Sequence, residues 1–161
     1  RSETAHAWWG ILWKFLTLQA RVKKARRWPN QNEWAHGAAA VHQYRAELAA
    51  HELGGEYVIA LKERRLSVVK KKRVLQLLKD KNHLYSVWLD SKKVVNLKQR
   101  CLCGSTGKKG HKRLRRCGSH SSDASSLAFS LLLWEIEEKA FWESFQDRQC
   151  CGTCDNCPLQ R

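Results

Sequence analysis

Four cysteines lie within eight residues in the last part of the sequence, and they carry its clearest chemical signal. Cys151, Cys154 and Cys157 follow C-x2-C-x2-C spacing, and Cys150 directly precedes them. This spacing lets a tight turn direct neighbouring sulfurs at one point, as thiolates do around Zn²⁺ or an iron–sulfur cluster. Disulfides between residues this close do not easily reach relaxed geometry. We therefore expect a metal here, Zn²⁺ first and an iron–sulfur cluster as the alternative.

A second group of candidate ligands lies upstream and mixes thiols with imidazoles. Its members are Cys101, Cys103, His111, Cys117 and His120. Together the two groups could fill two tetrahedral zinc sites with one ligand left over. They could also form one site that joins Cys117 to Cys151, Cys154 and Cys157. The sequence leaves both arrangements open, and disulfides or free thiols stay the metal-free alternative.

The last cysteines resemble a known zinc module. The run Cys151-Gly152-Thr153-Cys154-Asp155-Asn156-Cys157 follows a predicted helix and resembles the zinc-binding knuckle of RecQ-family DNA helicases. In that family an upstream cysteine beside arginines completes the site, a role that the resemblance gives to Cys117, which follows Arg115-Arg116. No helicase ATPase motif accompanies it. The resemblance implies a zinc knuckle close to nucleic acid.

The upstream group resembles a different zinc module. A predicted β-hairpin followed by Cys101, Cys103, Cys117 and His120 is similar to SWIM-type modules, which use C-x-C and then C-x-H. Here the second pair is C-x2-H, one residue longer. This resemblance also implies a zinc site in a protein that contacts nucleic acid.

Positive charge is concentrated in the middle third of the chain. The formal net charge of the 161 residues is +15, with 30 Lys and Arg against 15 Asp and Glu. Such a surplus destabilises a compact chain by self-repulsion unless a polyanion offsets it. Basic runs are typical of phosphate-binding patches and nuclear-import signals. We expect DNA or RNA to bind at Lys70, Lys71, Lys72, Arg73, Lys108, Lys109, Lys112, Arg113, Arg115 and Arg116.

Composition also bounds the compartment and the chemistry. The odd count of seven cysteines favours reduced thiols on a metal over a secreted disulfide scaffold. We expect an intracellular, nuclear protein, with a secreted protein as the alternative. No nucleophile, phosphate-loop or H-E-x-x-H motif is present, so we expect binding rather than catalysis and assign no catalytic residue. The chain begins at Arg1 and has no Met, so we expect a processed product or a fragment of a longer protein.

Hydrophobic periodicity predicts the elements that position these residues. Apolar spacing of i, i+3, i+4 predicts helices over about 5–28, 32–53 and 127–145, and Ser121-Ser122-Asp123 is typical of the start of the last one. Strands are expected at 57–61 and 66–69, and a hairpin at 84–89 and 93–97. The segment 72–79 fits either a short helix or a strand.

The predicted architecture is an α+β fold. It has an N-terminal helical hairpin over 1–55, then a basic β-hairpin segment with the Cys/His region and a C-terminal helix over 56–161; the two could form one compact domain. No segment is apolar over the length of a bilayer span. The eight tryptophans suggest the alternative function: a zinc- or disulfide-stapled interaction or effector protein whose Trp-rich helices contact another protein.

Overall fold

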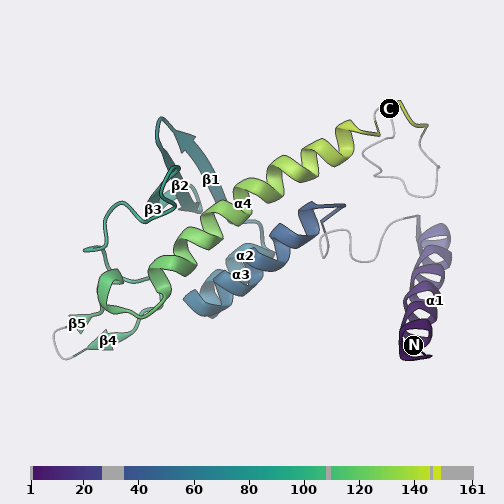
Figure 1. Ribbon diagram of the computed structural model, residues 1–161, viewed down its shortest axis with the longest axis horizontal. Helices are drawn as coiled ribbons and strands as arrows, with labels where there is room; N and C mark the ends of the chain where they lie inside the picture. Colours follow the sequence, from purple (N-terminus) through teal and green to yellow (C-terminus); the bar gives the residue numbers. More distant parts are fainter. Residues whose placement is uncertain (1, 27–34, 108–109, 146, 150–161) are drawn as a thin grey trace. The chain divides into compact units, whose positions relative to one another are not determined.

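The computed structural model describes residues 2–26, 35–107, 110–145 and 147–149 (Figure 1). It confirms the α+β class. The elements in chain order are α1 (Ser2–Ala25), α2 (Ala39–Leu53), α3 (Gly55–Lys62), β1 (Leu66–Lys71), β2 (Val74–Lys79), β3 (Asn82–Trp88), β4 (Thr106–Gly107), β5 (Gly110–His111), the 3₁₀ turn η1 (Leu114–Arg116) and α4 (His120–Glu143).

The chain forms two compact units. One contains residues 35–139, and the other contains 1–34 with 140–161. Helix α2 lies in the first of these units and shares a core with the sheet, and the expected boundary near residue 55 stays a prediction. Antiparallel packing of α1 on α2 stays a prediction, since these helices belong to different units. No helix in the described ranges is long and apolar enough to cross a membrane.

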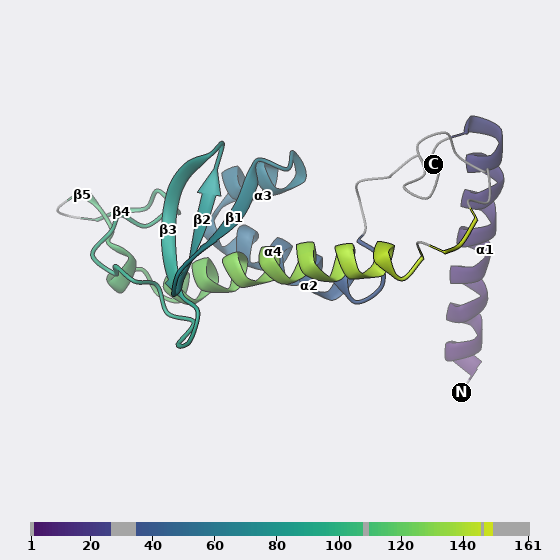
Figure 2. The ribbon, with the colours of Figure 1, turned by 90° about the horizontal axis from the view of Figure 1, so that it is seen from above.

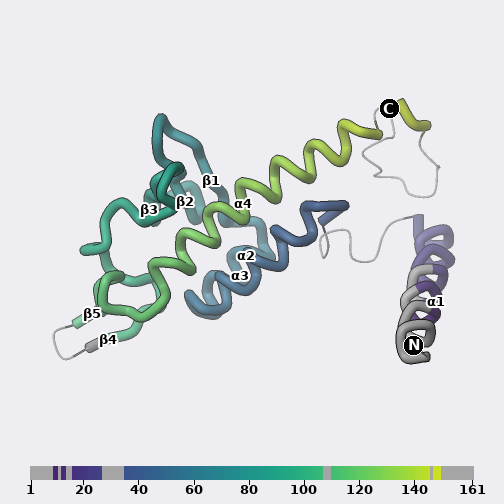
Figure 3. Tube along the Cα trace, in the orientation of Figure 1, coloured from purple at the N-terminus to yellow at the C-terminus, as the bar shows by residue number. Residues whose placement is uncertain are grey.

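Strands β1, β2 and β3 form an antiparallel meander with β2 in the centre (Figure 3). Both connections are two-residue turns, Lys72-Arg73 after β1 and Asp80-Lys81 after β2. Asp80 and Lys81 have φ of 51° and 65°, as a type I′ hairpin turn requires. The segment 72–79, whose sequence fits either a helix or a strand, is therefore mostly strand, because its apolar residues pair with β1 on one side and with β3 on the other.

One core lies between this sheet and the helices of the 35–139 unit (Figure 2). Side chains alternate along the strands, so that Leu75, Leu77, Tyr85 and Val87 face the helices and are fully or almost fully buried. The helices contribute small residues and leucines to the same cluster, among them Ala46, Ala50, Leu53, Ala124, Leu127 and Ala128.

Two sequence predictions were wrong in this unit. The expected strand at 57–61 is helix α3, which buries Tyr57, Ala60 and Leu61 at i, i+3, i+4 spacing. A five-residue apolar run cannot separate the two periods, and here the turn at Gly54 (φ 124°) begins a new helix. The second arm of the predicted hairpin, 93–97, is no strand; it keeps a single bridge between Val87 and Val94.

Helix boundaries also moved. α2 begins at Ala39 rather than near Asn32. Gly37, two residues before this helix, has a φ of +55°, which is incompatible with a right-handed α-helix. Residues 32–34 lie outside the described ranges. α4 begins at His120, one residue before the helix start that Ser121-Ser122-Asp123 indicates, and its first turn is polar: the Ser119 hydroxyl donates to the Asp123 carboxylate at 2.8 Å. Asp123 also suits the positive end of the helix dipole.

Tyr85 ties the sheet to the segment that follows it. Its side chain is 1% exposed, and its hydroxyl donates to the carbonyl oxygen of Arg100 at 2.8 Å. We expect Tyr85→Phe to lower the free energy of unfolding by about 1 kcal/mol, because the hydrogen bond that this buried side chain makes is lost. Urea denaturation checks this, with Tyr44→Phe as the control, since Tyr44 is 55% exposed. Equal stability of the two variants would contradict a stabilising role for the hydrogen bond between Tyr85 and Arg100.

Candidate metal centre

Four potential ligands meet at one point of the 35–139 unit. The sulfurs of Cys101, Cys103 and Cys117 and a ring nitrogen of His120 all lie within 4.8 Å of one another. Nδ1 of His120 lies 3.2 Å from the sulfur of Cys101 and 3.3 Å from that of Cys117. The sulfurs of Cys103 and Cys117 are 3.4 Å apart. Such a Cys₃His set could hold a metal ion.

Backbone pairing positions the C-x-C half of the cluster. The amide of Cys101 donates to the carbonyl of Lys112 at 2.9 Å, and the amide of Lys112 donates to the carbonyl of Ser105 at 2.9 Å. A bridge between Arg100 and Arg113 continues this pairing on the other side. Gly104, with φ of +70°, turns the chain directly after Cys103 and leads to the β4–β5 hairpin. The sulfurs of Cys101 and Cys103, which are two residues apart, both lie in the Cys₃His group.

The second half of the cluster comes from the turn that begins α4. Cys117 follows η1, and its amide donates to the carbonyl of Leu114 at 3.2 Å. The amide of His120 in turn donates to the carbonyl of Cys117 at 3.2 Å, around Gly118 at φ +55°. Leu114 is fully buried in the core, which anchors this turn to the sheet and helices. The C-x2-H spacing thus fits one tight turn into a helix.

The three thiols differ in their proton affinity. Burial raises the pKa of Cys101 to about 12 and also raises the pKa of Cys117. Partial burial pushes the pKa of Cys103 upward as well, but hydrogen bonds from Ser105 and from the two other thiols outweigh it. They lower the pKa of Cys103 to about 6. Cys103 is therefore the thiol of the three that loses its proton at the lowest pH.

Metal affinity should rise with pH, because thiols bind a cation as thiolates. Near neutral pH, Cys101 and Cys117 still carry protons while Cys103 has lost its own. Binding then releases about two protons, so the logarithm of the apparent affinity should rise by about two per pH unit, and more steeply below pH 6. Competition with a chromophoric chelator checks this in a chain with Cys150, Cys151, Cys154 and Cys157 changed to Ser. An affinity independent of pH would contradict it.

Of the other predicted ligands, the structure describes His111 alone, and it lies outside this cluster. His111 is exposed on β5, opposite Thr106, and does not belong to the group. Cys150, Cys151, Cys154 and Cys157 lie outside the described residues, so a second metal site there stays a prediction. The structure places Cys117 with Cys101, Cys103 and His120. All three cysteines in the described ranges are free of disulfides.

The predicted phosphate-binding residues fall on two surfaces. Lys70, Lys71, Lys72 and Arg73 are exposed at the end of β1 and in the β1–β2 turn. Lys112, Arg113, Arg115 and Arg116 are exposed beside the metal ligands. Lys108 and Lys109 lie outside the described residues. Of the aromatic residues on β3, Tyr85 is buried and Trp88 is 38% exposed.

Comparison with known families agrees with a cysteine-built domain. The profile of a family described as a cysteine-rich domain, C-terminal to an E2 domain, matches residues 35–159, which include every cysteine of the chain. The chain belongs to this family. Residues 1–30 match the profile of a prokaryotic E2 domain. No curated protein matches the sequence, and no solved structure matches it.

The family match and the ligand geometry agree in extent. The match begins at residue 35, where the compact unit that carries the cluster also begins. In this cysteine-rich domain three of the seven cysteines therefore converge with a histidine at the junction of the sheet and α4. All four ligands would come from the protein, which leaves no open position on a tetrahedral ion. Such a site stabilises a fold rather than activating water.

Proposed function

We propose that this cysteine-rich domain is a zinc-binding module that binds nucleic acid through its basic segment. The convergence of Cys101, Cys103, Cys117 and His120 within 4.8 Å carries the metal part. The exposed basic residues at the β1–β2 turn and around the ligands carry the nucleic-acid part. The family description adds a setting, since such domains follow an E2 domain.

Zinc fits this ligand set better than the alternatives. Zn–S bonds of about 2.3 Å and Zn–N bonds of about 2.0 Å place tetrahedral ligands about 3.5 to 3.8 Å apart. The observed separations of 3.2, 3.3 and 3.4 Å lie a few tenths of an ångström below that range. Iron–sulfur clusters most often take four thiolates, so a Cys₃His set favours zinc over the expected alternative. Ser105, 3.2 Å from the Cys103 sulfur, supplies an outer hydrogen bond.

The basic surface supports a polyanionic partner. Lys70, Lys71, Lys72 and Arg73 are consecutive, exposed, and form no ion pair with a carboxylate in the described ranges. Lys112, Arg113, Arg115 and Arg116 add charge on the segment that the metal would hold rigid. Basic side chains held by a metal-binding turn and by a tight hairpin lose little conformational entropy when they bind phosphates.

A salt titration tests the nucleic-acid part. The full chain, loaded with zinc, should bind DNA and RNA oligonucleotides at low salt, with the logarithm of the affinity falling linearly with the logarithm of salt concentration. Fluorescence anisotropy of a labelled oligonucleotide measures this. No binding at about 50 mM salt would contradict the proposal, because the electrostatic attraction is strongest there.

One observation favours the second candidate function, a protein-interaction module. Val41, Tyr44 and Leu48 are each about half exposed on α2, at i, i+3, i+7 spacing, and form an apolar stripe. On α1, Trp9 and Trp13 are also exposed. Two results together would favour this candidate: the zinc-loaded chain does not bind nucleic acid, and its self-association is lost in the triple variant Val41→Ser, Tyr44→Ser, Leu48→Ser. Sedimentation of the wild-type chain and of the triple variant measures the self-association.

A further inference from the structure

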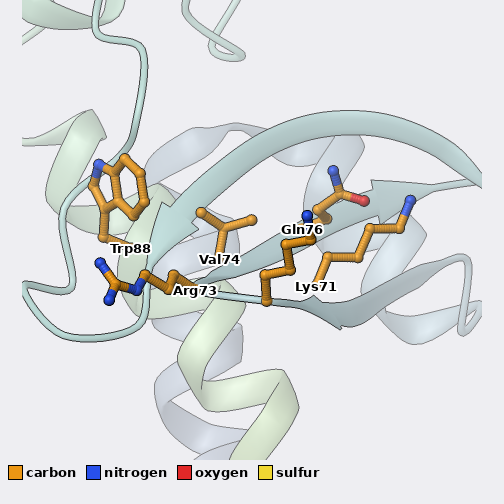
Figure 4. A pocket seen from close by; sticks show the side chains of 6 residues that line it. Lys71, Arg73, Val74, Gln76 and Trp88 are labelled. Carbon is orange, nitrogen blue, oxygen red and sulfur yellow. The ribbon is translucent and has the colours of Figure 1, made fainter.

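A shallow hollow of about 750 Å³ lies on the face of the sheet that is turned away from the core (Figure 4). Trp88 and Arg73 stand at one end of it, Lys71 and Gln76 stand at the other, and Val74 lies between them. The residues that line it come from all three strands and from the β1–β2 turn: Lys71, Lys72, Arg73, Val74, Gln76 and Trp88.

The strand register fixes this arrangement. Lys71 pairs with Val74 across β1 and β2, and Val74 pairs with Trp88 across β2 and β3. Residues that pair directly point to the same face of a sheet. Their neighbours Leu75 and Val87 point to the other face, where both are fully buried. The hollow therefore rests on a rigid, well-packed sheet.

An exposed tryptophan at this place is not explained by the core. Trp88 is 38% exposed, whereas Tyr85 and Val87 on the same strand are 1% and 0% exposed. A flat, partly exposed indole beside half-buried Val74 gives an apolar wall. The cations of Lys71, Lys72 and Arg73 surround that wall, and no carboxylate of the described ranges pairs with them.

We propose that this hollow binds single-stranded nucleic acid, with one base stacked on the Trp88 ring and the neighbouring phosphates held by Lys71, Lys72 and Arg73. The inference rests on the proposed function and narrows it to a class of ligand. Cations around an exposed aromatic ring are the combination by which proteins hold single strands without reading sequence. Gln76 adds an amide that can both donate to and accept from a base edge.

Duplexes fit this surface less well. In a duplex each base already stacks on its neighbours, so the Trp88 ring has no free base face to contact. Lys71, Lys72 and Arg73 can still reach the phosphates of a duplex. The electrostatic contribution to affinity is therefore common to single strands and duplexes, whereas stacking on the Trp88 ring contributes to the affinity for single strands alone.

The test compares single strands with duplexes on the zinc-loaded full chain. Labelled 15-nucleotide DNA and RNA strands and their duplexes are titrated by anisotropy against wild type, Trp88→Ala, Trp88→Phe and Tyr44→Ala. Trp88→Ala should weaken single-strand binding by about tenfold to a hundredfold and leave duplex binding within about twofold. Trp88→Phe should keep most of the affinity, and Tyr44→Ala, which removes an exposed aromatic on α2, should change nothing. Thermal melting confirms that each variant folds.

The outcomes separate this inference from the proposed function. If wild type binds both ligands in a salt-dependent way and Trp88→Ala changes neither, the inference is overturned while the proposed function stands. Equal weakening of both ligands by Trp88→Ala also overturns it, because the ring would then act through the fold. If neither ligand binds at low salt, both proposals fail and the hollow is left to a protein partner.

Discussion

His120→Ala should lower the melting temperature of the zinc-loaded chain by about 10 °C or more. Structural zinc sites contribute about 10–16 kcal/mol of apparent binding free energy, which is comparable to the whole stability of a domain. For a unit of this size, each kcal/mol shifts the melting temperature by several degrees. His120 also begins α4, so the loss frees the end of a helix that contributes Ala124, Leu127 and Ala128 to the core. Differential scanning calorimetry measures the shift.

His111 provides the matched control for this prediction. It is a histidine nine residues away, exposed on β5 and outside the Cys₃His group. His111→Ala should leave the melting temperature within about 1–2 °C of wild type, as surface substitutions usually do. Addition of a strong chelator should reduce wild type to the melting temperature of His120→Ala. Equal melting temperatures of the His111 and His120 variants in the presence of zinc would contradict the metal assignment.

Changing Lys70, Lys71, Lys72 and Arg73 to Gln should abolish most nucleic-acid binding. Each phosphate contact that disappears lowers the salt slope by about 0.7 to 0.9, so the slope should fall by about three. We expect the affinity at low salt to fall by about tenfold or more. The fold should persist, because all four side chains are exposed on the β1–β2 turn and at the end of β1. Anisotropy titrations between low and physiological salt give both quantities.

A second variant with the same loss of charge separates a local patch from net charge. Arg45, Lys62, Arg64 and Lys81 are exposed on other parts of the same unit. Their change to Gln removes four positive charges as well, but none from the β1–β2 turn. This variant should lose much less than the first in affinity and in salt slope. Equal losses would show that only net charge matters, and the assignment of Lys70–Arg73 would then be wrong.

Elements with a long or strictly alternating pattern were predictable from the sequence. The apolar spacing of α4 and the alternation of β3 arise from one buried face each, and both elements exist close to their predicted bounds. Shorter segments were not. The run at 57–61 is apolar throughout, and only the turn at Gly54 and the packing of Tyr57 against the core make it a helix. Similarly, 72–79 became a strand because β1 and β3 flank it.

The candidate site, too, was predictable from the sequence only in part. Residue type alone singled out Cys101, Cys103, Cys117 and His120, but it also offered His111 and a pairing of Cys117 with distant cysteines. The choice depends on a long-range fact, the backbone pairing of Cys101 with Lys112, which carries the C-x-C turn to the start of α4. The hollow at Trp88 was hidden for a similar reason. Its residues become neighbours only through the strand register, which a one-residue slip would reverse.

Zinc content of a chain with Cys150, Cys151, Cys154 and Cys157 changed to Ser tests the central claim most directly. Elemental mass spectrometry should find about one zinc per chain, because Cys101, Cys103, Cys117 and His120 would fill a tetrahedral ion by themselves. The same chain with Cys117→Ser should hold none. A folded parent chain without zinc would contradict the claim that these four residues form a metal centre.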